Sequence, residues 1–148
     1  MLMRCWPRGS GATSSAGRWP LVATADRADK DRAACRALLQ GDTGPLITTA
    51  LVIAEAAYLI DRQLGAQAGA ALYASITSGQ LEVASLDRED WQRIADLVTT
   101  YADLRLGGTD ASVITLAERL GTTRIATLNH RHFTVVRPRH AEAFELLP

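Results

Sequence analysis

Three carboxylates stand where they could act together. Asp103 and Asp110 lie seven residues apart on either side of a Gly107-Gly108 pair, and Glu55 interrupts an otherwise apolar stretch upstream. Carboxylate oxygens are the ligands that hard cations such as Mg²⁺ and Mn²⁺ prefer. The three acids are therefore candidate ligands of a divalent metal site.

Asp110 also has a purely structural interpretation. The apolar spacing predicts a helix over residues 109–120, with Thr109 as its N-cap and Gly121 just past its end. Asp110 would then lie in the first turn, where the helix dipole stabilises a carboxylate by a few tenths to about 1 kcal/mol. On this interpretation Asp110 only helps the helix to start.

The other two acids have alternatives as well. Glu55 could lie on a solvated helix face together with Tyr58 and Arg62, which follow at helical spacing. Asp103 could end the preceding helix or pair with Arg105. The pattern of residues alone leaves these alternatives open.

Hydrophobic periodicity predicts helices and strands in alternation. Trp91 is expected in the core, on one helix face with Ile94 and Val98. The alternation predicts a three-layer α/β/α domain with a mostly parallel central sheet, in which ligands bind beyond the carboxyl ends of the strands. Helices are expected over residues 25–39, 50–64, 66–78, 87–101 and 109–120, a short helical or irregular piece over residues 130–133, and strands over residues 46–48, 81–86, 124–128 and 144–147. Thr49 is expected to cap the helix over residues 50–64, which ends before Gly65.

Composition limits the class of protein. The chain has 148 residues, 47% of them hydrophobic, which suits one globular domain. Its formal net charge is zero, so no overall electrostatic field attracts it to nucleic acids or membranes. Cys5 and Cys35 form no metal-binding pair of the Cys-x-x-Cys type, so a reducing compartment is expected. The longest apolar run, residues 50–60, is too short to cross a membrane, and no signal peptide is evident, so a cytoplasmic location is expected.

Residues 1–19 differ from the rest of the chain. They mix Gly, Ser, Arg, Pro and Trp without a helical or strand period, and we expect them to be poorly ordered. Residues 20–148 are expected to form the folded domain. Neither a Gly-x-Ser-x-Gly hydrolase motif nor a Gly-x-Gly-x-x-Gly dinucleotide motif is present.

Several motifs resemble one family in their order and spacing. Residues 49–55 (TALVIAE), 101–111 (YADLRLGGTDA) and 127–133 (TLNHRHF), followed by 136–138 (VRP), resemble the PIN-domain ribonucleases. More narrowly, they resemble the VapC toxins of VapBC toxin-antitoxin pairs. The resemblance implies an endoribonuclease that depends on Mg²⁺ or Mn²⁺, has RNA as substrate, is silenced by a VapB-type antitoxin and forms a homodimer.

The family's site residues can be carried over to matching positions. The resemblance implies that Glu55 is the conserved glutamate, Asp110 the aspartate at the helix start and Asp103 a supporting acid. Asn129 occupies a position that is often aspartate, so a neutral oxygen replaces one charge there.

A local basic cluster follows the last of these motifs. Arg131 and Arg137 could contact RNA phosphates, together with Arg139 and the neighbouring histidines. A solvated loop whose arginines have salt partners is the alternative.

The chain departs from the family pattern near its N-terminus. The aspartate expected at the end of the first strand falls on Gly17, and Asp26 is a conceivable substitute about two turns further on. We hypothesise that a frameshift or a misplaced start has replaced the original N-terminal strand. The alternative function is then a catalytically inactive PIN-like protein that binds antitoxin or dimerises without cleaving RNA.

Overall fold

The structure is a computed structural model that describes residues 2–4, 33–35, 37 and 46–147. Residues 33–35 and 37 are helical and lie within the helix expected over residues 25–39. None of the helices in these ranges is long and apolar enough to span a membrane. The elements are β1 (Leu2–Arg4), β2 (Leu46–Thr49), α3 (Ala50–Leu64), α4 (Ala66–Thr77), β3 (Leu81–Ala84), α5 (Arg88–Thr100), the 3₁₀ helix η1 (Ala102–Leu104), α6 (Gly108–Leu120), β4 (Arg124–Ala126), α7 (His130–Val135) and β5 (Glu145–Leu147).

The strands form one five-stranded sheet in the order β3-β2-β1-β4-β5. Strands β2 and β3 pair in parallel, as do β4 and β5, whereas β1 pairs antiparallel with both β2 and β4. It follows that β2, β3, β4 and β5 share one direction and that β1 alone is reversed. The predicted mostly parallel α/β sheet is confirmed.

The reversed strand β1 occupies the centre of the sheet. Its first residue, Leu2, pairs with Ala126, and its last residue, Arg4, pairs with Leu46. The N-terminal end of β1 therefore lies at the edge where the other four strands have their carboxyl ends. We had expected no regular structure in residues 1–19, yet residues 2–4 form this strand; Gly17 and Asp26 lie outside the described residues.

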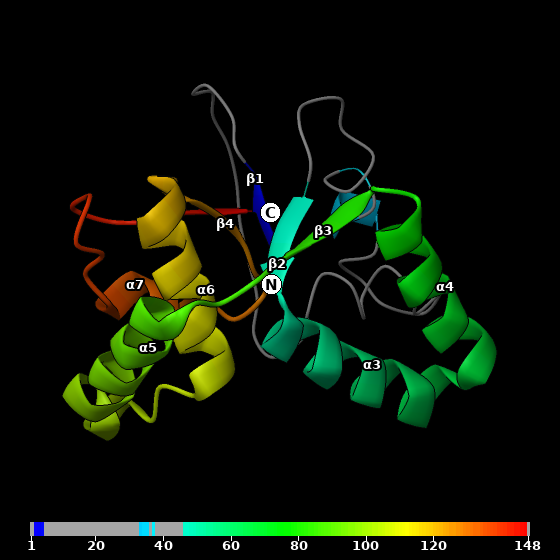
Figure 1. Ribbon diagram of the computed structural model, residues 1–148, viewed down its shortest axis with the longest axis horizontal. Helices are drawn as coiled ribbons and strands as arrows, with labels where there is room; N and C mark the ends of the chain where they lie inside the picture. Colours follow the sequence, from blue (N-terminus) through cyan, green and yellow to red (C-terminus); the bar gives the residue numbers. More distant parts are fainter. Residues whose placement is uncertain (1, 5–32, 36, 38–45, 148) are drawn as a thin grey trace.

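Helices cover both faces of the sheet, as the alternation of side chains in the strands requires (Figure 1). Ile47 of β2 and Ile125 of β4 face the core beneath α5, α6 and α7. Their neighbours Leu46 and Ala126 face the opposite core, beneath α3 and α4. The predicted three-layer arrangement is thus confirmed, and β2, β3, β4 and β5 each contribute side chains to two cores.

The ends of the helices follow from capping residues. Thr49 is the N-cap of α3, as predicted, and Gly121 ends α6 in the left-handed region with a φ of 63°. The prediction that Thr109 caps α6 is wrong, because the helix begins at Gly108 with Gly107 as its N-cap. The helix starts earlier than predicted, and Asp110 still lies in its first turn.

The predicted burial of Trp91 is wrong. Its side chain is 51% exposed, and Val98 on the same face is 37% exposed. Ile94 is buried as predicted, but its buried neighbours on α5 are Asp90 and Leu97, each one residue before the predicted Trp91 and Val98. Asp90 can take a buried position because Arg119 of α6 pairs with its carboxylate.

Candidate active site

A pair of buried hydroxyl groups joins the start of α6 to the end of β2. Thr49 Oγ1 and Ser112 Oγ lie 2.8 Å apart, and both side chains are fully buried. Ser112 Oγ donates to the carbonyl oxygen of Thr109 at 2.7 Å, so the Thr49 hydroxyl is the donor between the two side chains. This bond holds the first turn of α6, and Asp110 with it, at the carboxyl edge of the sheet.

The Asp110 carboxylate is not free at that edge. Its Oδ2 atom is in hydrogen-bond contact with Nδ1 of His132 on α7. Both side chains are largely buried, with 14% and 13% of their surface exposed. Because a carboxylate is only an acceptor, Nδ1 carries the hydrogen, and α6 and α7 are tied together through the predicted acid.

Asn129 lies at the same edge. It follows β4 as the N-cap residue of α7, although its side chain makes no capping bond there. Its backbone N–H donates to Thr127 Oγ1 at 3.0 Å. Asn129 and Asp110 thus flank α7 and the contact with His132.

The structure leaves Glu55 and Asp103 apart from this contact. Glu55 is half-buried in the second turn of α3, and its neighbours Tyr58 and Arg62 bond to each other at 3.1 Å. Asp103 is exposed in η1, and its suggested partner Arg105 forms no ion pair with it. Only one of the three predicted metal ligands, Asp110, therefore has a charged or imidazole partner within the described part of the chain.

The described residues do not by themselves fit a divalent metal ion. Across residues 2–4, 33–35, 37 and 46–147, no three His, Cys, Asp or Glu side chains gather closely enough to hold one. Strand β1 adds no acidic donor to this edge, because its residues Leu2, Met3 and Arg4 include no carboxylate. The resemblance places the family's first acid on Gly17, which lies outside the described residues.

The basic residues after β4 are exposed. Arg131 lies on α7, and Arg137 donates from its backbone N–H to Tyr101 Oη at 3.2 Å and from Nη1 to the carbonyl oxygen of Glu142 at 2.8 Å. Neither guanidinium forms an ion pair with a carboxylate of the described residues, so the alternative of a loop with salt partners is not what the structure has. Both positive charges remain available to an anionic ligand.

Arg93 is neutralised by Glu118, which lies near the C-terminal end of α6. Arg93 of α5 binds Glu118 through two bonds of 2.8 Å, and the backbone N–H of Arg139 donates to the same carboxylate at 2.9 Å. Burial raises the pKa of Glu118, but the hydrogen bonds from Arg93 and Arg139 outweigh it, and the pKa lies below its ordinary value. The hydrogen bond to Glu118 raises the pKa of Arg93. This pair joins α5 to α6 and does not contribute charge to the candidate site.

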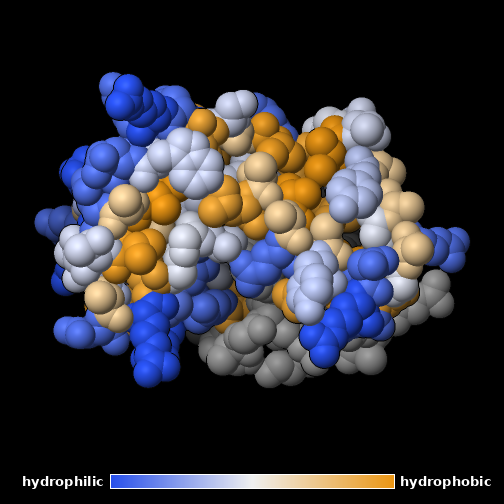
Figure 2. Space-filling view, turned by 60° about the horizontal axis from the view of Figure 1, so that its bottom comes forward, coloured by the Kyte–Doolittle hydropathy of each residue, from blue (hydrophilic) through white to orange (hydrophobic). Residues whose placement is uncertain are grey.

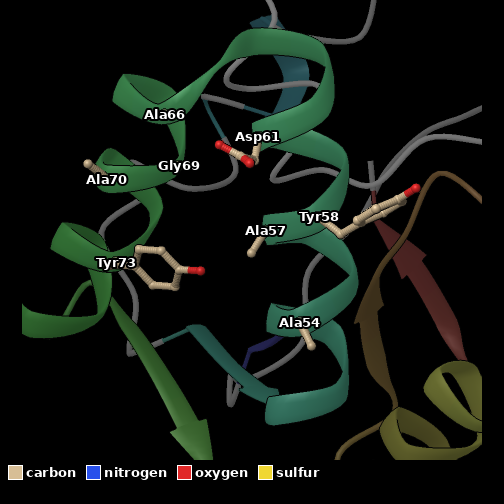
Figure 3. Close-up of a pocket in the computed structure, with 8 residues that line it drawn as sticks. All are labelled: Ala54, Ala57, Tyr58, Asp61, Ala66, Gly69, Ala70 and Tyr73. Carbon is tan, nitrogen blue, oxygen red and sulfur yellow. The ribbon is translucent and has the colours of Figure 1, made fainter.

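A shallow pocket of about 580 Å³ lies elsewhere, between α3 and α4. Asp61 and Tyr73 point into the space between the two helices (Figure 3). The face that includes α3 mixes hydrophobic with hydrophilic residues (Figure 2). The pocket has no basic side chain and none of the four predicted site residues, so its chemistry does not suit RNA. Its lining residues are Ala54, Ala57, Tyr58, Asp61, Ala66, Gly69, Ala70 and Tyr73.

Sequence reasoning missed two contributors to the candidate site. Ser112 looked like an ordinary residue of α6, although a polar residue on a buried helix face is a signal that it has a partner. His132 was considered only as part of the basic cluster. Helix α7 has six residues, too few to show a period that would reveal which way His132 points.

Three kinds of comparison with known proteins find similarity to this chain. A family model described as PIN domain matches residues 20–137. Ribonuclease VapC26 from Mycobacterium tuberculosis (strain ATCC 25618 / H37Rv) is 33% identical over 128 residues, covering 86% of this chain and 95% of that protein. The crystal structure of Mycobacterium tuberculosis VapC20, described as a sarcin-ricin loop cleaving toxin, matches with a TM-score of 0.65 over 71% of this chain and 81% of that chain. At 16% sequence identity, this last similarity shows the fold.

Proposed function

The chain belongs to the PIN-domain family, and from this membership we propose that it is a VapC-type ribonuclease, the toxin of a toxin-antitoxin pair. The observation that carries the proposal is the 33% identity to Ribonuclease VapC26, which extends over 95% of that protein. The position of Asp110 at the carboxyl edge of the sheet supports it, because ligands of such sheets bind at that edge.

RNA is the proposed substrate, and Arg131 and Arg137 are the proposed phosphate contacts. Both are exposed: Arg131 lies on α7, which also carries His132, the partner of Asp110, and Arg137 follows that helix by two residues. Guanidinium groups suit phosphate recognition because their donors match two phosphate oxygens at once.

Ribonucleases of this kind generally depend on a divalent metal ion. Mg²⁺ or Mn²⁺ is proposed for this chain because Glu55, Asp103 and Asp110 offer carboxylates, with Asn129 as a neutral donor. Since the described residues do not form a three-donor site, the proposal requires a further donor or a rearrangement of these side chains.

Cleavage of a fluorescently labelled RNA is the test of the proposed activity. We expect the purified chain to cut the RNA with Mn²⁺ present, to stop when EDTA is added, and to lose most of this activity in Asp110→Asn. Glu89→Gln is the matched control, because it removes an exposed carboxylate of α5 outside the site. Equal activity in Asp110→Asn and the control would exclude the proposed role of Asp110.

A second candidate function is an inactive PIN-like protein that binds antitoxin or dimerises without cleaving RNA. The sequence near the N-terminus favours it, because the position of the family's first acid falls on Gly17. Calorimetric titration with Mn²⁺ separates the two candidates when the unaltered chain is compared with Gly17→Asp and Asp110→Ala. Binding by the unaltered chain that Asp110→Ala abolishes favours the ribonuclease. Binding that appears only in Gly17→Asp favours the inactive protein.

The remaining proposals concern the setting in which the protein works. A VapB-type antitoxin is the proposed partner, a homodimer the proposed assembly and the cytoplasm the proposed location. Light scattering of the purified chain tests the dimer. Copurification with the product of a neighbouring gene, when both are expressed together, tests the antitoxin.

A further inference from the structure

Arg105 has an unusual backbone conformation for a residue with a side chain. It ends η1 in the left-handed region, with φ 56° and ψ 43°. The other residues with positive φ in the described part of the chain are Gly65, Gly79 and Gly121. Glycine adopts this region without the steric cost that a Cβ atom brings. The turn alone would favour glycine, so the arginine side chain needs another explanation.

The guanidinium of Arg105 is exposed and has no carboxylate partner among the described residues. Arg105 differs in this from Arg93, which pairs with Glu118, and from Arg119, which pairs with Asp90. An arginine remains charged at any ordinary pH. Arg105 therefore presents an uncompensated positive charge to the solvent.

The loop that carries Arg105 is joined to the segment that carries the proposed RNA contacts. Tyr101 accepts a hydrogen bond from the backbone N–H of Leu106 through its carbonyl oxygen at 3.4 Å, and from Arg137 through its hydroxyl at 3.2 Å. A second connection is the contact between Asp110 and His132. Tyr101 thus joins the loop before α6 to Arg137, and the contact between Asp110 and His132 joins the start of α6 to α7.

We propose that Arg105 contacts a phosphate of bound RNA, and that the left-handed turn directs its side chain toward the RNA strand where it passes Asp110. The inference rests on the proposed ribonuclease function and extends the RNA surface beyond Arg131 and Arg137. Its ligand class is the phosphodiester backbone, which a guanidinium binds through paired hydrogen bonds. Such a contact fixes the position of the RNA and does not read its sequence.

RNA binding in the presence of EDTA tests the proposal without requiring cleavage. The probe is a fluorescent RNA hairpin, and its anisotropy is measured at several KCl concentrations. Arg105→Asn removes the charge and keeps a residue that tolerates the left-handed region, whereas Arg105→Lys keeps the charge. We expect Arg105→Asn to weaken binding about three- to tenfold and to lower the slope of log affinity against log salt by about 0.7, while Arg105→Lys stays near the unaltered chain.

Arg88→Gln is the matched control for the loss of one positive charge. Arg88 is exposed at the start of α5, a helix of 13 residues that places it about 20 Å along the axis from Tyr101. Arg105→Asn should unfold at a urea concentration no lower than that of the unaltered chain, which separates loss of contact from loss of fold. An Arg105→Asn affinity equal to that of the unaltered chain, or to that of Arg88→Gln, overturns the inference. Absence of RNA binding in the unaltered chain overturns the proposed function itself.

Discussion

Asp110 of α6 and His132 of α7 are in direct hydrogen-bond contact, through Oδ2 and Nδ1. The residues are 22 apart in sequence, with β4 between their helices. The contact gives the helix-start aspartate a second structural task, because the same carboxylate that the family resemblance assigns to catalysis also holds the short helix α7. A cation that used both carboxylate oxygens would compete with the imidazole.

The energy of this contact can be measured with a double-mutant cycle. His132→Ala, Asp110→Ala and the double variant are compared by urea unfolding. We expect a coupling energy of about 1–2 kcal/mol, since hydrogen bonds to a charged group exceed those between neutral groups and both side chains are largely buried.

A second cycle controls for effects that pass through α7 alone. It replaces His132→Ala by Val135→Ala, an exposed substitution on the same helix. Its coupling to Asp110→Ala should lie below about 0.5 kcal/mol. A coupling as small in the first cycle would show that Asp110 and His132 do not stabilise the fold together.

The buried hydroxyl pair of Thr49 and Ser112 makes a second prediction. Thr49→Val keeps the shape of the side chain but removes the donor to Ser112 and the N-cap of α3. We expect Thr49→Val to lower the free energy of unfolding by about 1–2 kcal/mol, and Thr49→Ser to retain most of this stabilisation. Thr99→Val, which removes an exposed hydroxyl bonded within α5, should change the free energy of unfolding by less than about 0.5 kcal/mol. Equal effects of Thr49→Val and Thr99→Val would contradict a role for the buried pair.

The elements that sequence reasoning predicted well are those with a long periodic pattern or a clear stop signal. Helix α3 runs from the predicted cap Thr49 to Gly65, and α6 ends at the predicted Gly121. The direction of β2, β3, β4 and β5 followed from the alternation of strands with helices, which needs crossover connections. These features depend on residues close together in the sequence.

The features that escaped prediction depend on distant partners. The reversal of β1 depends on pairing with β2 and β4, and three residues carry no direction in their pattern. Pairing of Asp110 with His132 depends on how α7 meets α6. The metal site stays a prediction that rests on three acids expected near one edge; among the described residues, no three His, Cys, Asp or Glu side chains gather closely enough to hold an ion.

Trp91 shows how a one-residue error in helix register misplaces a side chain. The apolar count favours the face with Trp91 and Val98, but the ion pair of Asp90 with Arg119 allows the adjacent face to be buried. We expect Trp91→Ala to lower the free energy of unfolding by less than about 1 kcal/mol and Leu97→Ala, which is fully buried, to lower it by about 2–5 kcal/mol. Urea unfolding of the two variants measures both. The opposite order of effects would mean that the predicted face of α5 is the buried one.

The ion pair of Glu118 with Arg93 predicts how stability depends on pH. The pKa of Glu118 is lower in the folded chain than its ordinary value of 4.5. Between these two pKa values the unfolded chain therefore binds more protons than the folded one. The stabilisation is therefore present above about pH 4.5 and is lost as the pH falls through the lower, folded-state pKa.

Glu118→Gln should lower the free energy of unfolding at about pH 6 by about 1–3 kcal/mol, and should lose less stability than the unaltered chain between about pH 6 and pH 3. Urea midpoints at the two pH values measure the difference, with Glu89→Gln as the exposed control on α5. If Glu118→Gln loses as much stability on acidification as the unaltered chain, the pair with Arg93 does not account for the acid sensitivity of the fold.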